Sequence, residues 1–185
     1  GNPIRTLGIV HTAVVHGDAR CYAIACASII AKVLRDGLMR RLARDGHRLV
    51  LTAAPDAREK AIVGRILGEA GVPVTDLSGM LSLRELAALS ARARLFFGVD
   101  SAPMHIASAM GTPVVALFGP SGEDEWRPWM TAHRVVASPA HPCRPCGNDG
   151  CGGGKVSECL TSLPVDAVLA AFDSLRRELS ARSSC

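Results

Sequence analysis

The sequence has few aromatic residues, little net charge and no apolar run long enough to cross a membrane. Phe, Tyr and Trp make up 4% of the 185 residues, which argues against the aromatic platforms of single-stranded nucleic-acid binders. The net charge of +4 is spread along the chain, so it marks no nucleic-acid-binding stripe. The longest apolar run, residues 22–31, ends at Lys32 and falls short of the roughly 20 residues of a transmembrane helix. No basic leader precedes it, so we expect a cytoplasmic protein.

Familiar catalytic signatures are missing as well. The sequence has no P-loop, no zinc-protease helix and no order of Ser, His and Asp that is typical of a hydrolase. Seven cysteines are an odd number, which excludes complete disulfide pairing within one chain. The chain also lacks repeats, linkers and low-complexity tracts, and its 48% apolar residues suffice for a sizeable core. We therefore expect a single domain over residues 1–185.

Apolar periodicity predicts strands that alternate with helices. The expected strands are residues 7–15, 48–52, 72–77, 95–99, 114–118 and 134–137. The expected helices are residues 28–44, 57–70, 83–91, 102–110 and 165–179, with a short helical turn at 123–129 and a frayed tail at 180–185. Such alternation predicts βαβ units and an α/β fold with a mainly parallel sheet. The strand runs are apolar on both faces, as a sheet covered by helices requires.

Two polar turns follow neighbouring strands in this scheme. Asp100 and Ser101 come after the strand at 95–99, and Gly119, Pro120 and Ser121 come after the strand at 114–118. The carboxyl ends of parallel strands meet at one edge of a sheet, where loops feed helix N-termini that attract phosphate. Glycine in the second turn allows a ligand to come close to the backbone. We expect the two turns to lie side by side.

The helix at 102–110 is expected to keep free amides at its start. The helices at 57–70 and 83–91 have a Glu three residues after the capping residue, a capping-box pattern, whereas this helix has Met104 there. Ser101 can cap one amide, and Pro103 has no N–H to satisfy. The remaining donors are open to water or to a ligand oxygen. A phosphate group is the ligand that this arrangement favours.

Asp100 and His105 each allow two interpretations. Asp100 suits the hydroxyl groups of a sugar, because a carboxylate accepts hydrogen bonds well, but capping of the helix explains it equally. His105 lies one turn into the helix and either points toward a ligand or packs as a core histidine. The two residues do not make a complete catalytic set, so we expect them to hold a ligand.

A loop at residues 139–162 is rich in proline, glycine and cysteine. Four cysteines in it follow the spacing C-x2-C-x4-C-x7-C, namely Cys143, Cys146, Cys151 and Cys159. Four thiolates can close a tetrahedral zinc site or, less favoured, hold an iron–sulfur cluster. His141 is near enough in sequence to replace one sulfur. The alternative is a set of free or partly oxidised thiols in an irregular loop.

Residues 97–121, FGVDSAPMHIASAMGTPVVALFGPS, resemble the carboxyl-terminal half of the ADP-heptose:lipopolysaccharide heptosyltransferase family. Trp126, Arg127, the cysteine-rich loop and the final helix resemble that family too. The cysteine pattern, from the CRPC at residues 143–146 to the KVSEC at 155–159, is most similar to its heptosyltransferase III branch. The resemblance covers about residues 46–178.

This resemblance implies a GT-B glycosyltransferase, of which the chain is the carboxyl-terminal half: a Rossmann-like, three-layer α/β/α domain. Heptose would pass from ADP-heptose, with inversion, to a heptose or Kdo of the lipopolysaccharide inner core, and no cofactor is required. Asp100 would hold hydroxyl groups of the donor heptose, and His105 would reach the diphosphate. Ser101, Ala102 and Met104 would line the nucleotide and phosphate pocket, and Gly119, Pro120 and Ser121 would form its rim.

Two departures from the family pattern shape the expected function. The family's enzymes are longer than this chain, and their aspartate base belongs to an amino-terminal domain, through which the lipopolysaccharide acceptor would bind. Residues 8–45 are atypical, because the family's His-Pro, Lys and Trp pattern is not found there. We therefore expect a donor-binding half-enzyme with no catalytic residue of its own, inactive alone and able to associate with the inner membrane or with itself. The alternative is a non-catalytic, metal-stabilised interaction module built on the cysteine loop.

Overall fold

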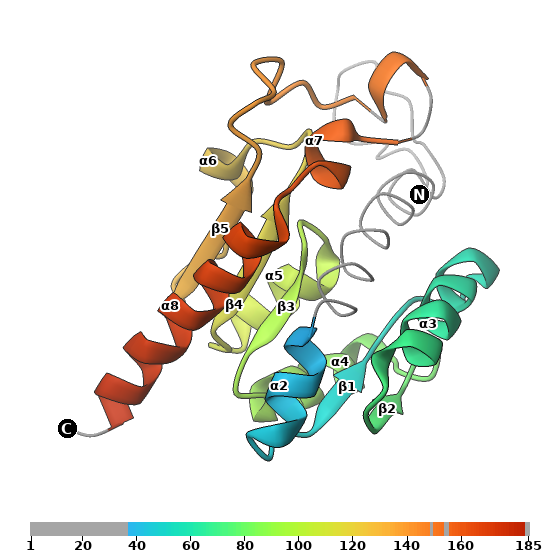
Figure 1. Ribbon diagram of the computed structural model, residues 1–185, viewed down its shortest axis with the longest axis vertical. Coiled ribbons are helices and arrows are strands. Elements are labelled where there is room, and N and C mark those ends of the chain that lie inside the picture. Colours follow the sequence, from blue (N-terminus) through green and yellow to red (C-terminus); the bar gives the residue numbers. More distant parts are fainter. Residues whose placement is uncertain (1–36, 149, 154–155, 184–185) are drawn as a thin grey trace, which may run out of the picture.

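The computed structural model describes residues 37–148, 150–153 and 156–183. The predicted strand at 7–15, the apolar run at 22–31 and the first part of the helix predicted at 28–44 lie outside these residues. The elements along the chain are shown in Figure 1. They are α2 (Met39–Arg44), β1 (Leu49–Leu51), α3 (Ala57–Ala70), β2 (Val74–Asp76), α4 (Leu83–Arg92), β3 (Phe96–Val99), α5 (Ala102–Ala109), β4 (Val114–Phe118), α6 (Glu123–Trp126), β5 (His133–Ala137), the short 3-10 turn η2 (Cys151–Gly153), α7 (Glu158–Thr161) and α8 (Val165–Ser183).

The described strands pair in parallel throughout. β1 pairs with β2, and β4 lies between β3 and β5 in a second, three-stranded sheet. Parallel neighbours need a crossover connection, and helices supply it: α3 lies between β1 and β2, α5 between β3 and β4, and α6 between β4 and β5. The predicted α/β class with parallel pairing is confirmed.

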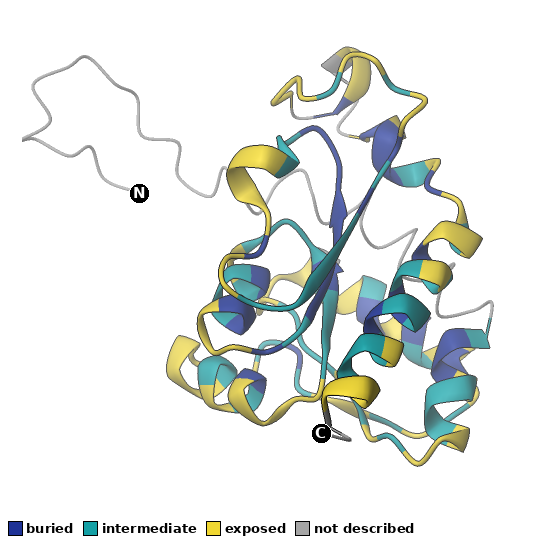
Figure 2. Cartoon of the chain, turned by 90° about the vertical axis from the view of Figure 1, so that its left-hand side faces the viewer, coloured by how far each residue is buried: buried dark blue, intermediate teal, exposed yellow. Residues whose placement is uncertain are grey.

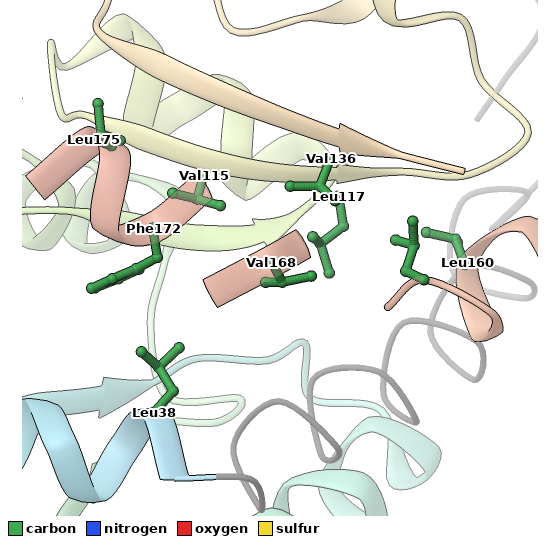
Figure 3. Close-up of a cluster of buried hydrophobic side chains, with 9 residues drawn as sticks. Leu38, Val115, Leu117, Val136, Leu160, Val168, Phe172 and Leu175 are labelled. Atoms are coloured by element: carbon green, nitrogen blue, oxygen red, sulfur yellow. The ribbon is translucent and has the colours of Figure 1, made fainter. Parts of the chain in front are cut away.

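The central strand β4 is buried on both faces. Val115 and Leu117 point into a core shared with α8, and the residues that alternate with them point into a core shared with α5. This is the pattern of a parallel strand with a helix on each side. Figure 2 shows a dark, buried strand next to a largely teal, intermediate one, between helices whose outer faces are exposed. Figure 3 shows the α8 side, where the apolar side chains are Leu38, Val115, Leu117, Val136, Leu160, Val168, Phe172 and Leu175.

A smaller core lies around β1 and β2. Met39 from α2 and Ile66 and Ala70 from α3 are its buried members. Their partly buried neighbours include Leu49 in β1 and Val74 in β2. The amphipathic helix predicted at 57–70 therefore packs its apolar face on the first parallel pair, as its spacing indicated.

Ion pairs join α8 to two distant parts of the chain. Arg41 pairs with Asp173 at 2.9 Å, Arg176 with Asp45 at 2.9 Å, and Arg134 with Glu178 at 2.8 Å. The hydrogen bond from Arg134 lowers the pKa of Glu178. These side chains are partly exposed, so the pairs set the position of α8 more than they stabilise the fold.

Three predicted boundaries differ from the structure. The tail expected to fray from residue 180 continues α8 to Ser183, where Arg182 pairs with Glu178 one turn back at 2.8 Å. The turn predicted at 123–129 ends at Trp126, because Pro128 cannot extend the hydrogen-bonded helix. The loop at 139–162 includes the one-turn helix α7.

We predict that Leu117→Ala lowers the free energy of unfolding by about 2–5 kcal/mol, because it leaves a cavity in a fully buried strand. Chemical denaturation of the variant and of the parent chain measures this difference. Leu83→Ala is the matched control, since Leu83 is 71% exposed and its loss should change stability by no more than about 0.5 kcal/mol. Equal effects of the two substitutions would contradict the burial of β4.

Candidate functional site

The carboxyl ends of β3 and β4 lie side by side. Val99, the last residue of β3, is opposite Leu117 in the parallel register. The Asp100 amide continues the ladder by donating to the Leu117 carbonyl at 3.1 Å. Asp100 therefore starts its turn beside Phe118, the residue that precedes Gly119. The expectation that the two polar turns share one edge of the sheet is confirmed.

Asp100 and His105 contact each other at this edge. Nε2 of His105 is 3.4 Å from Oδ1 of Asp100, and the two side chains are 41% and 14% exposed. His105 is thus no core histidine. Among the described residues, the side-chain partner of Asp100 is His105 rather than an amide of α5, so the simple capping interpretation of Asp100 does not hold. A carboxylate and an imidazole in contact, both partly open to solvent, form a polar pair that a ligand can reach.

The start of α5 keeps more free donors than the sequence indicated. Ser101 is the N-cap residue but makes no side-chain cap, because its hydroxyl donates to the Val99 carbonyl at 3.1 Å. The predicted cap by Ser101 is therefore wrong. The amides of Met104 and His105 both donate to the Ser101 carbonyl. Within the described ranges, the amides of Ser101 and Ala102 have no hydrogen-bond partner, and the helix dipole adds partial positive charge there.

Two residues expected near a ligand lie in the core instead. Met104 is fully buried beside Ala116 and Phe118, so its side chain holds α5 against β4 and does not face a pocket. Pro120 is buried as well. Ala102 is exposed at the start of α5. The hydroxyl of Ser121 is buried and makes no hydrogen bond with the described residues.

Trp126 lies next to this pair, although the sequence did not single it out as a site residue. Its indole meets the His105 ring edge-on, with 6.1 Å between ring centroids, and 55% of it is exposed. It belongs to α6, the single helical turn that follows the second polar turn. A partly exposed indole beside a polar pair offers an apolar surface for a ring or a sugar face.

Gly119 is required by close packing. A Cβ at this position would lie 2.6 Å from Cγ and Cδ1 of Leu160, a side chain that is itself fully buried. The glycine therefore lets α7, which carries Leu160, pack against the second turn. Packing against the core therefore requires a glycine at this predicted site position, whatever its contact with a ligand.

The four cysteines of the loop differ in exposure. Cys143, Cys146 and Cys151 are exposed and Cys159 is buried, all as free thiols. Nowhere in the described part of the chain do three or more His, Cys, Asp or Glu side chains gather so that they could hold a metal ion. His141 bonds to the Ser138 hydroxyl at 2.7 Å. The tetrahedral zinc site that the cysteine spacing suggested therefore stays a prediction.

We predict that Gly119→Ala destabilises the chain by about 1–3 kcal/mol through overpacking against Leu160. Leu160→Ala, although costly by itself, removes the atoms that a new Cβ would meet. The double variant should therefore lose less free energy of unfolding than the sum of the losses in the two single variants. A double-mutant cycle in thermal or chemical denaturation measures the coupling, and strict additivity would count against this packing.

We predict that a thiol reagent labels Cys143, Cys146 and Cys151 in the folded chain well before Cys159. Burial raises the pKa of the Cys159 thiol, an effect that the nearby Arg144 guanidinium partly opposes, and the reactive thiolate is therefore scarce at neutral pH. Mass spectrometry of peptides after timed alkylation measures each site. Denatured chain is the control, in which all four should react alike; fast labelling of Cys159 in the folded chain would contradict the structure.

Comparison with known proteins places these features in a family. Residues 23–156 match glycosyltransferase family 9 (heptosyltransferase). Lipopolysaccharide heptosyltransferase 3 of Escherichia coli is 48% identical over 85 residues, which are 45% of this chain and 25% of that protein. The solved structure of E. coli ADP-heptose lps heptosyltransferase II has a TM-score of 0.62 and 22% identity, and covers 83% of this chain and 42% of that one.

The matched relatives are much longer than this chain, which spans a quarter of the first and less than half of the second. A shorter likeness, 58% identity over 41 residues, joins the chain to ribonuclease HII of Trichodesmium erythraeum and covers 19% of that protein. It is too short to show a family. The family match, by contrast, extends over most of the chain and includes both polar turns, the Asp100–His105 pair and α6. The chain therefore belongs to glycosyltransferase family 9, the heptosyltransferases.

Proposed function

We propose that this chain binds the donor ADP-heptose for transfer of heptose to the lipopolysaccharide inner core. The observation that carries the proposal is the Asp100–His105 pair, which lies at the sheet edge beside the amides of Ser101 and Ala102, for which the described residues offer no hydrogen-bond partner. The printed names of the matched E. coli proteins, a lipopolysaccharide heptosyltransferase and an ADP-heptose lps heptosyltransferase, support this choice of donor and acceptor.

The charged and polar groups at this edge favour two different parts of the donor, the diphosphate and the sugar. The amides of Ser101 and Ala102, with the dipole of α5, favour the negatively charged diphosphate. His105 adds a donor to the same group. Asp100 would repel a phosphate, so it faces the sugar, where its carboxylate accepts hydrogen bonds from heptose hydroxyls. Contact with His105 offsets part of the carboxylate charge and allows both groups to serve one ligand.

Transfer itself needs a group that removes the proton from the acceptor hydroxyl. Asp100 and His105 already contact each other and serve the donor in this proposal. In keeping with the family resemblance, the base comes from an amino-terminal domain that also binds the acceptor. We therefore propose that the 185 residues by themselves bind the donor but do not turn it over.

Two further expectations stay predictions. The alternative, a metal-stabilised interaction module, would use the loop cysteines, and no group of three or more metal-ligating side chains is found among the described residues. Helices long and apolar enough to span a membrane do not occur within the described ranges. Association with the membrane face or with a second copy of the chain stays a prediction.

We predict that isothermal calorimetry detects binding of both ADP and ADP-heptose to the folded chain. His105→Gln should lower the affinity for both ligands by about tenfold, because it removes a charge-assisted hydrogen bond to the diphosphate. Asp100→Asn should lower the affinity for ADP-heptose by a similar factor and leave the affinity for ADP unchanged, because the carboxylate faces the sugar.

His133→Gln is the matched control. This half-buried histidine lies at the first residue of β5, at the opposite edge of the sheet, where it contacts the Thr131 carbonyl. Its replacement should leave both affinities as they are. A folded chain that gives no binding heat with millimolar ADP or ADP-heptose would contradict the proposed function.

A further inference from the structure

Arg144 lies between two exposed cysteines, yet its own side chain is only 8% exposed. A guanidinium this deeply buried is costly unless its N–H groups are satisfied. Nε donates to the Gly119 carbonyl, NH1 to the Ser138 carbonyl at 3.4 Å, and NH2 to a carboxylate oxygen of Glu123 at 2.7 Å. One side chain thus connects the residues that follow β4 and β5 with the first residue of α6.

The backbone next to Arg144 holds the same turn. The amides of Cys146 and Gly147 both donate to the Pro120 carbonyl, at 3.1 and 2.9 Å. Two successive carbonyls of the second polar turn therefore point toward residues 144–147. Because a trans peptide unit is planar, its N–H points away from its carbonyl. The Ser121 amide consequently points away from the loop, and it has no hydrogen-bond partner among the described residues.

The ion pair with Glu123 extends this support to the Asp100–His105 pair. α6 has four residues and makes no side-chain cap at its N-cap Gly122, so by itself it would not persist. Arg144 holds its first residue. Its last residue, Trp126, contacts the His105 ring edge-on, and His105 in turn contacts Asp100.

We propose that Arg144 is a positioning residue: it fixes the second polar turn and α6, and through Trp126 the orientation of His105 toward the donor diphosphate. The proposal rests on the proposed function, because it gives the diphosphate as the ligand of that edge. Arg144 does not itself contact the ligand, since its three nitrogens already meet protein oxygens and little of its surface is open. Lysine can reproduce only part of the role, because one ammonium group cannot span three acceptors in a planar fork.

Two readouts test this in chains that carry Trp129→Phe, so that Trp126 is the only tryptophan. The first needs no ligand: the indole N–H resonance of Trp126 and the ring resonances of His105 in NMR spectra. Arg144→Met should shift or broaden both sets, and Arg144→Lys should restore part of the parent spectrum. The second readout is calorimetry, in which Arg144→Met should weaken ADP by about tenfold and Arg144→Lys by less.

Arg134→Met is the matched control. Arg134 also uses three nitrogens, for Glu178, Ser174 and the His133 carbonyl, but it lies at the start of β5 and touches neither turn. Its replacement should change neither the resonances nor the affinity. If Arg144→Met does not fold, Glu123→Gln serves in its place, because it breaks only the ion pair and should still shift the Trp126 resonance.

The outcomes separate this inference from the proposed function. A parent chain that does not bind ADP refutes the donor site, whereas the ligand-free resonances still decide whether Arg144 holds α6 and His105. Folded Arg144→Met or Glu123→Gln chains with unchanged resonances would overturn the inference. So would a loss of ADP affinity without any change at Trp126 and His105, because Arg144 would then bind phosphate directly.

Discussion

The candidate site depends on the burial of β4, a strand whose five residues are all shielded from water. Its alternate side chains pack against α8 on one face and α5 on the other, so a shift of one residue would move apolar groups to the wrong core. The parallel register of β4 with β3 and β5 then places the carboxyl ends of these strands side by side. Asp100, Gly119 and Ser138 follow those ends. A single packing constraint thus decides where three separate turns meet.

Much of this arrangement could be predicted from the sequence, because it follows from short-range patterns. Apolar runs of strand length and helices with regular spacing gave the parallel scheme, and the rule that parallel strands share a carboxyl edge brought Asp100 near Gly119. The capping box at Ser82 and Glu85 is present as expected. The contact between Asp100 and His105 was not predicted, although it is local: only four residues lie between them, and they span the first turn of α5.

The remainder depends on contacts that sequence spacing does not encode. The Ser101 hydroxyl could accept a hydrogen bond from a helix amide or donate one to a backbone carbonyl. In the structure Ser101 has an extended backbone, and its hydroxyl donates to the Val99 carbonyl. Met104 lies at a position that faces either the ligand edge or the core, and only the packing of α5 on β4 decides between them. The spacing of the four cysteines drew attention to the thiols, but the side chain that hydrogen-bonds to the second polar turn is that of Arg144, between the first two cysteines. No local sequence pattern shows that an arginine will hydrogen-bond to residues far from it along the chain.

Cysteine chemistry in this loop consequently has a mechanical aspect. Cys143 and Cys146 flank Arg144 and are open to solvent, while the amides of Cys146 and Gly147 donate to the Pro120 carbonyl in the turn that follows β4. A thiol adduct on Cys146 would therefore sit on the same residue whose amide holds the second polar turn. Reducing conditions consequently belong among the controlled variables whenever this chain is handled.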